Sequence, residues 1–273
     1  MSFVYNKNEY AVTTWTLEHM SLKDAINTFD SYGFKNIEIW ADTVHLDPRR
    51  NPDIGEVKEQ LRRFGMSVHS LHAPFRNYKN PPSDEREFRR LRTEIVKKTI
   101  DYAYELGSDI LVLHALDRGE YNYSAGQLEL VRDYIGEIVD YGLKSGVRIA
   151  VEDIPQGSAS NEIVTTLENQ KRLFGDLGIK YCLDIGHTIL LGADLFREVD
   201  CAGSDLITFH IHNNYGSFDD HNLPDDGVID WPQLHDYVRN AGFSGEFVLE
   251  IYGGSDRKSE MEILGRINSL FEK

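Results

Sequence analysis

Short apolar runs alternate with longer amphipathic stretches along the whole chain. The short runs are rich in β-branched and aromatic residues and predict β-strands, whereas apolar residues three and four apart in the longer stretches indicate helices with one buried face. Leu128, Val131 and Ile135 mark one such face, and Ser21 with Asp24 three residues later predicts the start of another helix. The expected strands are residues 10–14, 36–40, 67–72, 109–114, 148–152, 180–184, 206–212 and 246–252.

A helix is expected after each strand, and this unit recurs about eight times. The repeat predicts a parallel sheet in a single α/β domain over residues 1–273, a (β/α)8 TIM barrel with its active site at the C-terminal ends of the strands. An open doubly wound sheet is the alternative, but it usually carries a glycine-rich phosphate turn after its first strand, where this chain reads T-T-W. Glycines mark the turns from the predicted helices into the next strand: Gly33, Gly65, Gly107, Gly146, Gly178 and Gly242.

The composition is that of a soluble globular protein, with 41% hydrophobic and 27% charged residues. A formal net charge of −16 argues against nucleic acid as a partner, since tight binding needs a basic surface, and it favours divalent cations. The two cysteines, Cys182 and Cys201, form no C-x-x-C pair and are expected to be free thiols. The first residues lack a signal-peptide pattern, and no apolar run approaches the roughly 18 residues that span a bilayer. We therefore expect a cytoplasmic protein without a membrane partner.

Histidine, aspartate or glutamate stands at the end of six predicted strands. In a TIM barrel these ends meet at the face that carries the active site. A single strand-end residue is more often a hydrogen-bonded anchor than a ligand, but six in agreement predict a site suited to zinc, manganese or iron(II). The strand-end candidates are His72, His114, Glu152, Asp184, His210 or His212, and Glu250, and the following loops add His187, Asp219 and His221.

Other residues near the strand ends have weaker claims on the site. His210 and His212 share one face of a strand, so their spacing does not decide which of them binds a metal. His69 is expected to be structural, because strand alternation turns it away from the face that Ser70 and His72 share. Four aromatic residues either wall a pocket or pack in the core, and seven arginines are expected mostly on solvated helix faces. These are Trp15, Trp40, Phe75 and Tyr252, and Arg49, Arg50, Arg62, Arg63, Arg89, Arg90 and Arg92.

Four motifs give the chain a resemblance to a known family over essentially its whole length. They are H-A-P-F at 72–75, V-E-D at 151–153, D-I-G-H at 184–187 and D-D-H-N-L-P-D-D-G at 219–227, the last with Asp225 where the family usually has glycine. The chain resembles the xylose isomerase-like TIM barrel superfamily. That superfamily contains sugar phosphate isomerases and epimerases as well as the endonuclease IV-like proteins of AP endonuclease family 2.

The resemblance implies two alternative metal sites. Similarity to the epimerases and isomerases implies one divalent ion, often manganese, held by residues that match Glu152, Asp184, His210 and Glu250, with the two glutamates exchanging protons with carbon. Similarity to endonuclease IV implies three zinc ions: one held by His72, His114 and Glu152, a second by Glu152, Asp184, His210 and Glu250, and a third by His187, Asp219 and His221. Alignment to the family's H-L-x-D motif favours His210 over His212.

These observations predict an enzyme of carbohydrate metabolism that isomerises or epimerises a sugar or polyol ketone. Glu152 and Glu250 would transfer the proton through a metal-stabilised enediolate, and His187 would orient the substrate oxygen. The alternative is a multinuclear zinc phosphodiesterase. Each pattern has a departure: D-I-P-Q-G follows Glu152 where tagatose and psicose epimerases carry an Asn-Arg motif, and N-N follows H-I-H where endonuclease IV keeps an acidic residue. The choice of sugar and a homo-oligomeric state stay open.

Overall fold

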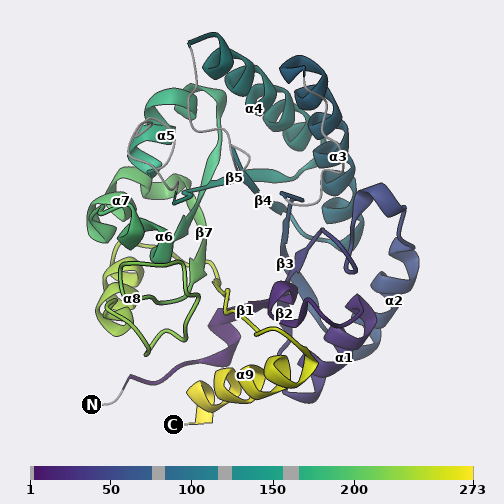
Figure 1. Cartoon of the computed structure of the whole chain (residues 1–273), viewed down its shortest axis with the longest axis vertical. Helices are drawn as coiled ribbons and strands as arrows, with labels where there is room; N and C mark the ends of the chain where they lie inside the picture. The colour runs from purple at the N-terminus through teal and green to yellow at the C-terminus, as the bar shows by residue number, and fades with distance from the viewer. Residues whose placement is uncertain (1–2, 76–83, 116–124, 156–165, 273) are drawn as a thin grey trace.

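Eight parallel strands close into a barrel that is surrounded by helices, which confirms the predicted (β/α)8 TIM barrel (Figure 1). The structure, a computed structural model, describes residues 3–75, 84–115, 125–155 and 166–272. Every strand pairs in parallel with its neighbours in sequence, and β1 pairs with β8 to complete the ring. The strands are β1 (Tyr10–Thr13), β2 (Asn36–Trp40), β3 (Ser67–His72), β4 (Ile110–His114), β5 (Arg148–Glu152), β6 (Lys180–Asp184), β7 (Leu206–Ile211) and β8 (Phe247–Leu249).

Helices cover the outside of the barrel and bury its outward-facing side chains. The main core lies between the two layers, where Ile37 and Ile39 of β2 belong to the same apolar cluster as Ile26 and Phe29 of the first helix. No helix among the described ranges is long and apolar enough to cross a membrane. The helices are α1 (Leu22–Ser31), α2 (Ile54–Phe64), α3 (Glu85–Leu106), α4 (Ala125–Ser145), α5 (Leu167–Phe174), α6 (Ile185–Leu190), α7 (Leu195–Ala202), α8 (Trp231–Asn240) and α9 (Arg257–Ser269).

On β4, β5 and β6, the buried side chains that face the barrel interior are apolar below the strand ends and polar at the carboxyl ends. Because strand residues two apart share a face, Val112 and His114 follow Ile110 on β4, and Glu152 follows Ala150 on β5. Ile110, Val112 and Ala150 form a small buried cluster with Cys182 of β6. This layer therefore supports the strand-end histidines and carboxylates from below.

The ends of the elements follow the predicted local chemistry. Ser21 caps α1 by accepting a hydrogen bond from the backbone N–H of Asp24. The six glycines expected at the turns into strands all have positive φ. The strand boundaries agree with the predicted ones within a few residues; β7 ends at Ile211 rather than at residue 212, and β8 is only Phe247–Leu249.

Two register shifts interrupt the regular pairing of the barrel. Ile37 pairs with Val68 and Glu38 with Ser70, so His69 is the extra residue of β3; Ile207 is the extra residue of β7 in the same way. His69 lies outside the candidate site, but its Nε2 is 3.0 Å from Thr208 Oγ1 on β7, on the opposite side of the barrel. The simple alternation that was expected to turn His69 away from the Ser70 face is therefore broken at the bulge.

Candidate metal centre

Three carboxylates and one imidazole meet at the carboxyl end of the barrel. His210 of β7 lies with its Nδ1 3.2 Å from Glu250 Oε2, 3.4 Å from Glu152 Oε1 and 3.9 Å from Asp184 Oδ2. Asp184, Glu152 and His210 are at most 1% exposed, and Glu250 is 9% exposed. These four side chains, here called the central group, are the set expected for a single divalent ion.

The donor atoms of the central group suit a divalent cation. His210 Nδ1 is buried and has no hydrogen-bond partner among the described residues, although carboxylate oxygens face it. Buried carboxylates without a counter-charge repel one another strongly, since the surrounding dielectric is low. A cation bound by Nδ1 and these oxygens would satisfy the orphan nitrogen and offset the repulsion.

A histidine pair lies against the other oxygen of Glu152. His72 of β3 and His114 of β4 each place Nε2 3.1 Å from Glu152 Oε2, while Glu152 Oε1 faces His210. The His72 Nδ1 lies 2.9 Å from the Ala73 carbonyl oxygen, which only accepts, so this nitrogen donates. A neutral His72 ring therefore carries its lone pair on Nε2. One glutamate thus joins the histidine pair to the central group.

A second group of possible ligands lies farther out, on α6 and the loop that follows β7. His187 Nε2 and His221 Nε2 are each 3.3 Å from an oxygen of Asp219. Their Nδ1 atoms donate to backbone carbonyl oxygens, of Asp153 and Glu250 respectively, at 2.8 Å. Both rings therefore direct Nε2, the nitrogen available to a metal, toward Asp219, and with His212 these residues form the outer group.

The structure distinguishes the positions of the two histidines at the end of β7, His210 and His212, which spacing could not do. His210 lies in the central group, whereas His212 Nε2 is 2.8 and 3.0 Å from the two oxygens of Asp184, and the His212 ring stacks on His221 with centroids 3.8 Å apart. Gly186 makes this placement possible, because a Cβ at position 186 would overlap the His212 ring. His212 is therefore a neighbour of the central group through Asp184 and a possible ligand of the outer group.

The electrostatics of the site favour added positive charge. Burial alone would lower the pKa of His187 and His210, but the surrounding carboxylates outweigh it and raise both well above the ordinary histidine value. The same contacts hold the pKa of Glu152 and Asp219 well below ordinary values, despite burial. Divalent cations supply such positive charge without protonating the imidazoles that would bind them.

Three buried residues that contact the candidate ligands or their backbone were not among the ligands predicted from the sequence. Asp153 accepts hydrogen bonds from the backbone N–H of Asp184 and from Thr188 Oγ1, and burial beside Asp184 raises its pKa well above the ordinary value. Arg92 of α3 donates to the carbonyl oxygens of His114 and Ala115. The third residue is Glu38 of β2, which faces His210.

Arg92 and Arg89 correct the expectation that arginines of this region lie on solvated helix faces. They are 1% and 5% exposed, and the Arg92 guanidinium lies over the ring of Tyr134 at 4.9 Å. The expectation holds for Arg50, Arg62, Arg63 and Arg90, whose side chains are exposed. A helix-periodic pattern alone could not reveal a guanidinium that reaches over the end of β4.

Aromatic side chains surround the candidate ligands. The Phe75 ring is 4.6 Å from His114, and the Trp15 ring is 4.8 Å from His221 and 6.0 Å from Tyr252. Trp40 is buried and packs on Phe75 at 6.1 Å. Trp15 and Phe75 therefore pack against candidate ligands, Tyr252 lies next to Trp15, and Trp40 packs on Phe75.

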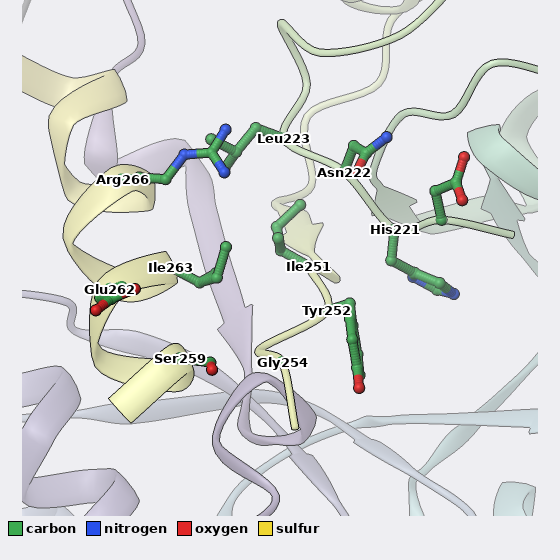
Figure 2. A pocket seen from close by; sticks show the side chains of 11 residues that line it. His221, Asn222, Leu223, Ile251, Tyr252, Gly254, Ser259, Glu262, Ile263 and Arg266 are labelled. Atoms are coloured by element: carbon green, nitrogen blue, oxygen red, sulfur yellow. The ribbon is translucent and has the colours of Figure 1, made fainter. Parts of the chain in front are cut away.

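A cavity of about 290 Å³ lies between the loop after β7, the loop after β8 and α9 (Figure 2). His221 lies at the edge of the cavity, with its ring directed away from α9, and Tyr252 lies nearby on the loop after β8. The residues that line the cavity include His221 but none of the central group. The cavity is therefore a neighbour of the outer group rather than the metal position itself.

Fold and side chains together define a TIM barrel whose candidate metal centre lies at the carboxyl ends of its strands. Residues 28–267 match the family model of the xylose isomerase-like TIM barrel, and the chain belongs to this family. It is similar to the uncharacterized protein MJ1311 of Methanocaldococcus jannaschii, with 25% identity over 269 residues, covering 94% of this chain and 88% of that protein.

Solved structures show the same fold. A D-tagatose 3-epimerase-like protein superimposes with a TM-score of 0.77 at 22% identity, covering 97% of this chain and 98% of its own. The IolI protein with a bound zinc atom gives a TM-score of 0.74 at 18% identity, with coverage of 97% and 98%. At these identities the likeness establishes the architecture alone.

Proposed function

We propose that the protein is a divalent-metal-dependent isomerase or epimerase that acts on a sugar or polyol ketone. One observation carries the proposal: the carboxylates of Glu152 and Glu250 face the same free nitrogen, His210 Nδ1, at 3.4 and 3.2 Å. Two carboxylates that lie next to one candidate cation position would supply the two acid–base groups that proton transfer at a carbon next to a carbonyl uses. The epimerase-like and zinc-binding neighbours of the same fold support this proposal.

Each residue of the central group has a distinct task in this reaction. Asp184, His210, Glu152 and Glu250 would hold the cation, which when bound polarises the substrate carbonyl and the adjacent hydroxyl. Nearby histidines hold the pKa of both glutamates below ordinary values despite burial, so both are ionised at neutral pH. One ionised glutamate removes the proton beside the carbonyl, and a proton is returned to that carbon by water or by the other glutamate after it has taken up a proton from water.

His187 lies where it can orient the substrate. Its Nδ1 is anchored on the Asp153 carbonyl oxygen, which leaves Nε2 to face the open side of the centre near Asp219. An imidazole held in this way can donate a hydrogen bond to a substrate oxygen once its Nε2 is protonated, a state that the nearby carboxylates favour.

The proposal predicts solvent proton exchange that depends on Glu152. Protein loaded with manganese or zinc should introduce deuterium from heavy water at the carbon next to the carbonyl of at least one ketose or polyol ketone, as followed by NMR. Glu152→Gln should reduce the rate by at least roughly 100-fold, because the amide cannot accept the proton. Glu198→Gln is the matched control, since Glu198 is also buried but lies on α7 and accepts a hydrogen bond from the backbone N–H of Glu168. Exchange that survives in Glu152→Gln would contradict the assignment.

A zinc phosphodiesterase is the second candidate, and the histidine pair on Glu152 together with the outer group favours it. It requires three tightly held zinc ions per chain and cleavage of a duplex with an abasic site. His221→Ala separates the two functions: an isomerase should retain its central ion and lose mainly substrate affinity, whereas the hydrolase should lose an ion together with activity. The net charge of −16 weighs against a DNA substrate.

A further inference from the structure

Glu38 is a charged residue in the middle of a strand whose other buried residues are apolar. It lies on β2, is fully buried, and shares the interior face of the barrel with Trp40 rather than the outward face of Ile37 and Ile39. Burial of an isolated carboxylate is strongly unfavourable, so a glutamate here needs specific partners. Its partners lie on other strands.

One oxygen of Glu38 makes both of its polar contacts. Oε2 accepts a hydrogen bond from Ser70 Oγ on β3 at 2.8 Å and lies 3.2 Å from His210 Nε2 on β7. An ionised carboxylate is an acceptor only, and Oε2 already accepts from Ser70, so this geometry suits a His210 ring that donates from Nε2.

This contact determines which nitrogen of His210 is available to a metal. With the proton on Nε2, a neutral ring carries its lone pair on Nδ1, the atom that faces Glu152, Glu250 and Asp184 and has no hydrogen-bond partner in the described part of the chain. The Glu38 carboxylate lies on the Nε2 side of the ring, while the other three lie on the Nδ1 side.

His210 is held in a different way from the other histidines of the site. In His72, His187 and His221, Nδ1 donates to a backbone carbonyl oxygen close to a strand end, and Nε2 is the nitrogen available to a metal. In His210 the available nitrogen is Nδ1, and Nε2 points to a carboxylate from β2. A carboxylate is a stronger acceptor than a carbonyl oxygen, and it also raises the basicity of the ligand nitrogen.

We propose that Glu38 is a positioning residue for the metal centre: its carboxylate fixes the tautomer and the ring orientation of His210, so that Nδ1 is presented to the cation of the central group. The inference rests on the proposed function only in requiring that a divalent cation occupies this group. Glu38 belongs to none of the possible ligand groups among the described residues, and it would act through His210, to which the cation would bind directly.

The test is the metal affinity of Glu38→Gln. Calorimetric titration of chelator-treated protein with zinc or manganese should show an affinity about 10–100-fold weaker than that of the unsubstituted protein, the usual effect of removing a carboxylate that orients a histidine ligand. The absorption spectrum of the cobalt(II)-loaded protein should change as well, because the geometry of the His210 ligand changes. Glu38→Asp retains the charge but shortens the side chain, so its affinity should lie between the two.

Glu260→Gln is the matched control. Glu260 is also fully buried and contacts a histidine, with its Oε1 2.9 Å from His19 Nδ1, but it lies on α9 outside the three possible ligand groups. Its substitution should leave the metal affinity and the cobalt spectrum unchanged, even if the stability of the fold decreases.

Wild-type affinity and an unchanged cobalt spectrum in Glu38→Gln, or in Glu38→Asp if the first variant does not fold, would overturn the inference. The outcome is independent of the reaction, since no substrate is present. A metal-loaded protein that catalyses no proton exchange would defeat the proposed isomerase and leave the role of Glu38 intact.

Discussion

Individual residues of the candidate site were predictable from the sequence where they end a strand or lie in the segment that follows it. Glu152, Asp184 and His210 could be found because a polar side chain follows an apolar run, and the structure brings them together. Glu38 could not be found by that rule, because it stands inside the run N-I-E-I-W and its partners are on β3 and β7. The available signal was a charged residue within a buried strand.

The close approach of Gly186 to His212 leads to a prediction about stability at the scale of one atom. Gly186→Ala should destabilise the folded state by about 1–3 kcal/mol, because the added methyl group would overlap a rigid, fully buried ring that is hydrogen-bonded to Asp184. Urea denaturation measures the change.

Gly265→Ala provides the comparison, since a Cβ there meets nothing within 4 Å on α9 and alanine favours a helix over glycine by about 0.5–1 kcal/mol. Equal effects of the two substitutions would show that the contact with His212 does not limit position 186.

At the scale of elements, the hydrophobic period located all eight strands but missed the two register shifts. The hydrophobic pattern of the strands and the glycine turns depend on residues that are near one another in the sequence, so they can be read from the sequence directly. A bulge depends on how neighbouring strands pair, and so the contact between His69 and Thr208 across the barrel could not be derived from alternation within β3. The same limit applies to Arg92, whose partners are carbonyl groups at the end of β4.

The loop after β2 should make the protein sensitive to acid. His45 in this loop is 6% exposed, and burial lowers its pKa to about 4, although Nε2 contacts the carbonyl oxygen of Leu17. The unfolded chain, with a histidine pKa of about 6.5, therefore binds more protons than the folded chain between pH 6.5 and pH 4. Stability is fully retained above pH 6.5 and falls as the pH decreases through this window.

His45 alone should lower the free energy of unfolding by about 2 kcal/mol between pH 7 and pH 5. Urea denaturation of His45→Gln at both pH values should show a smaller decrease than the unsubstituted protein. His69, whose pKa is also lowered to about 4, contributes equally to both proteins and cancels in the comparison. An identical decrease in the two proteins would assign the acid sensitivity to other groups.

At the scale of the whole molecule, the cation and the fold should stabilise each other. Carboxylates of the central group are buried together in a chain of net charge −16, and a bound cation offsets their repulsion in the folded state only. Free zinc or manganese at about 100 times its dissociation constant should add about 2.7 kcal/mol and raise the melting temperature by roughly 5–10 °C.

Differential scanning fluorimetry with added metal and with a chelator measures this shift. Asp184→Asn is the control, since loss of a central carboxylate should greatly reduce the response. A melting temperature that does not respond to either metal in the unsubstituted protein would argue against a cation in the central group.

The order of the strands β5 to β8 determines when such a cation can bind during folding. In a small zinc finger the ligands are near neighbours in sequence, so the ion can bring them together and drive folding. Here Glu152, Asp184 and His210 lie at the ends of β5, β6 and β7, and Glu250 follows β8, so the central group is complete only when these four strands have paired. Contacts between residues so far apart in sequence form late and slowly. We therefore expect the ion to bind after this half of the barrel has assembled, and not to act as the template for its assembly.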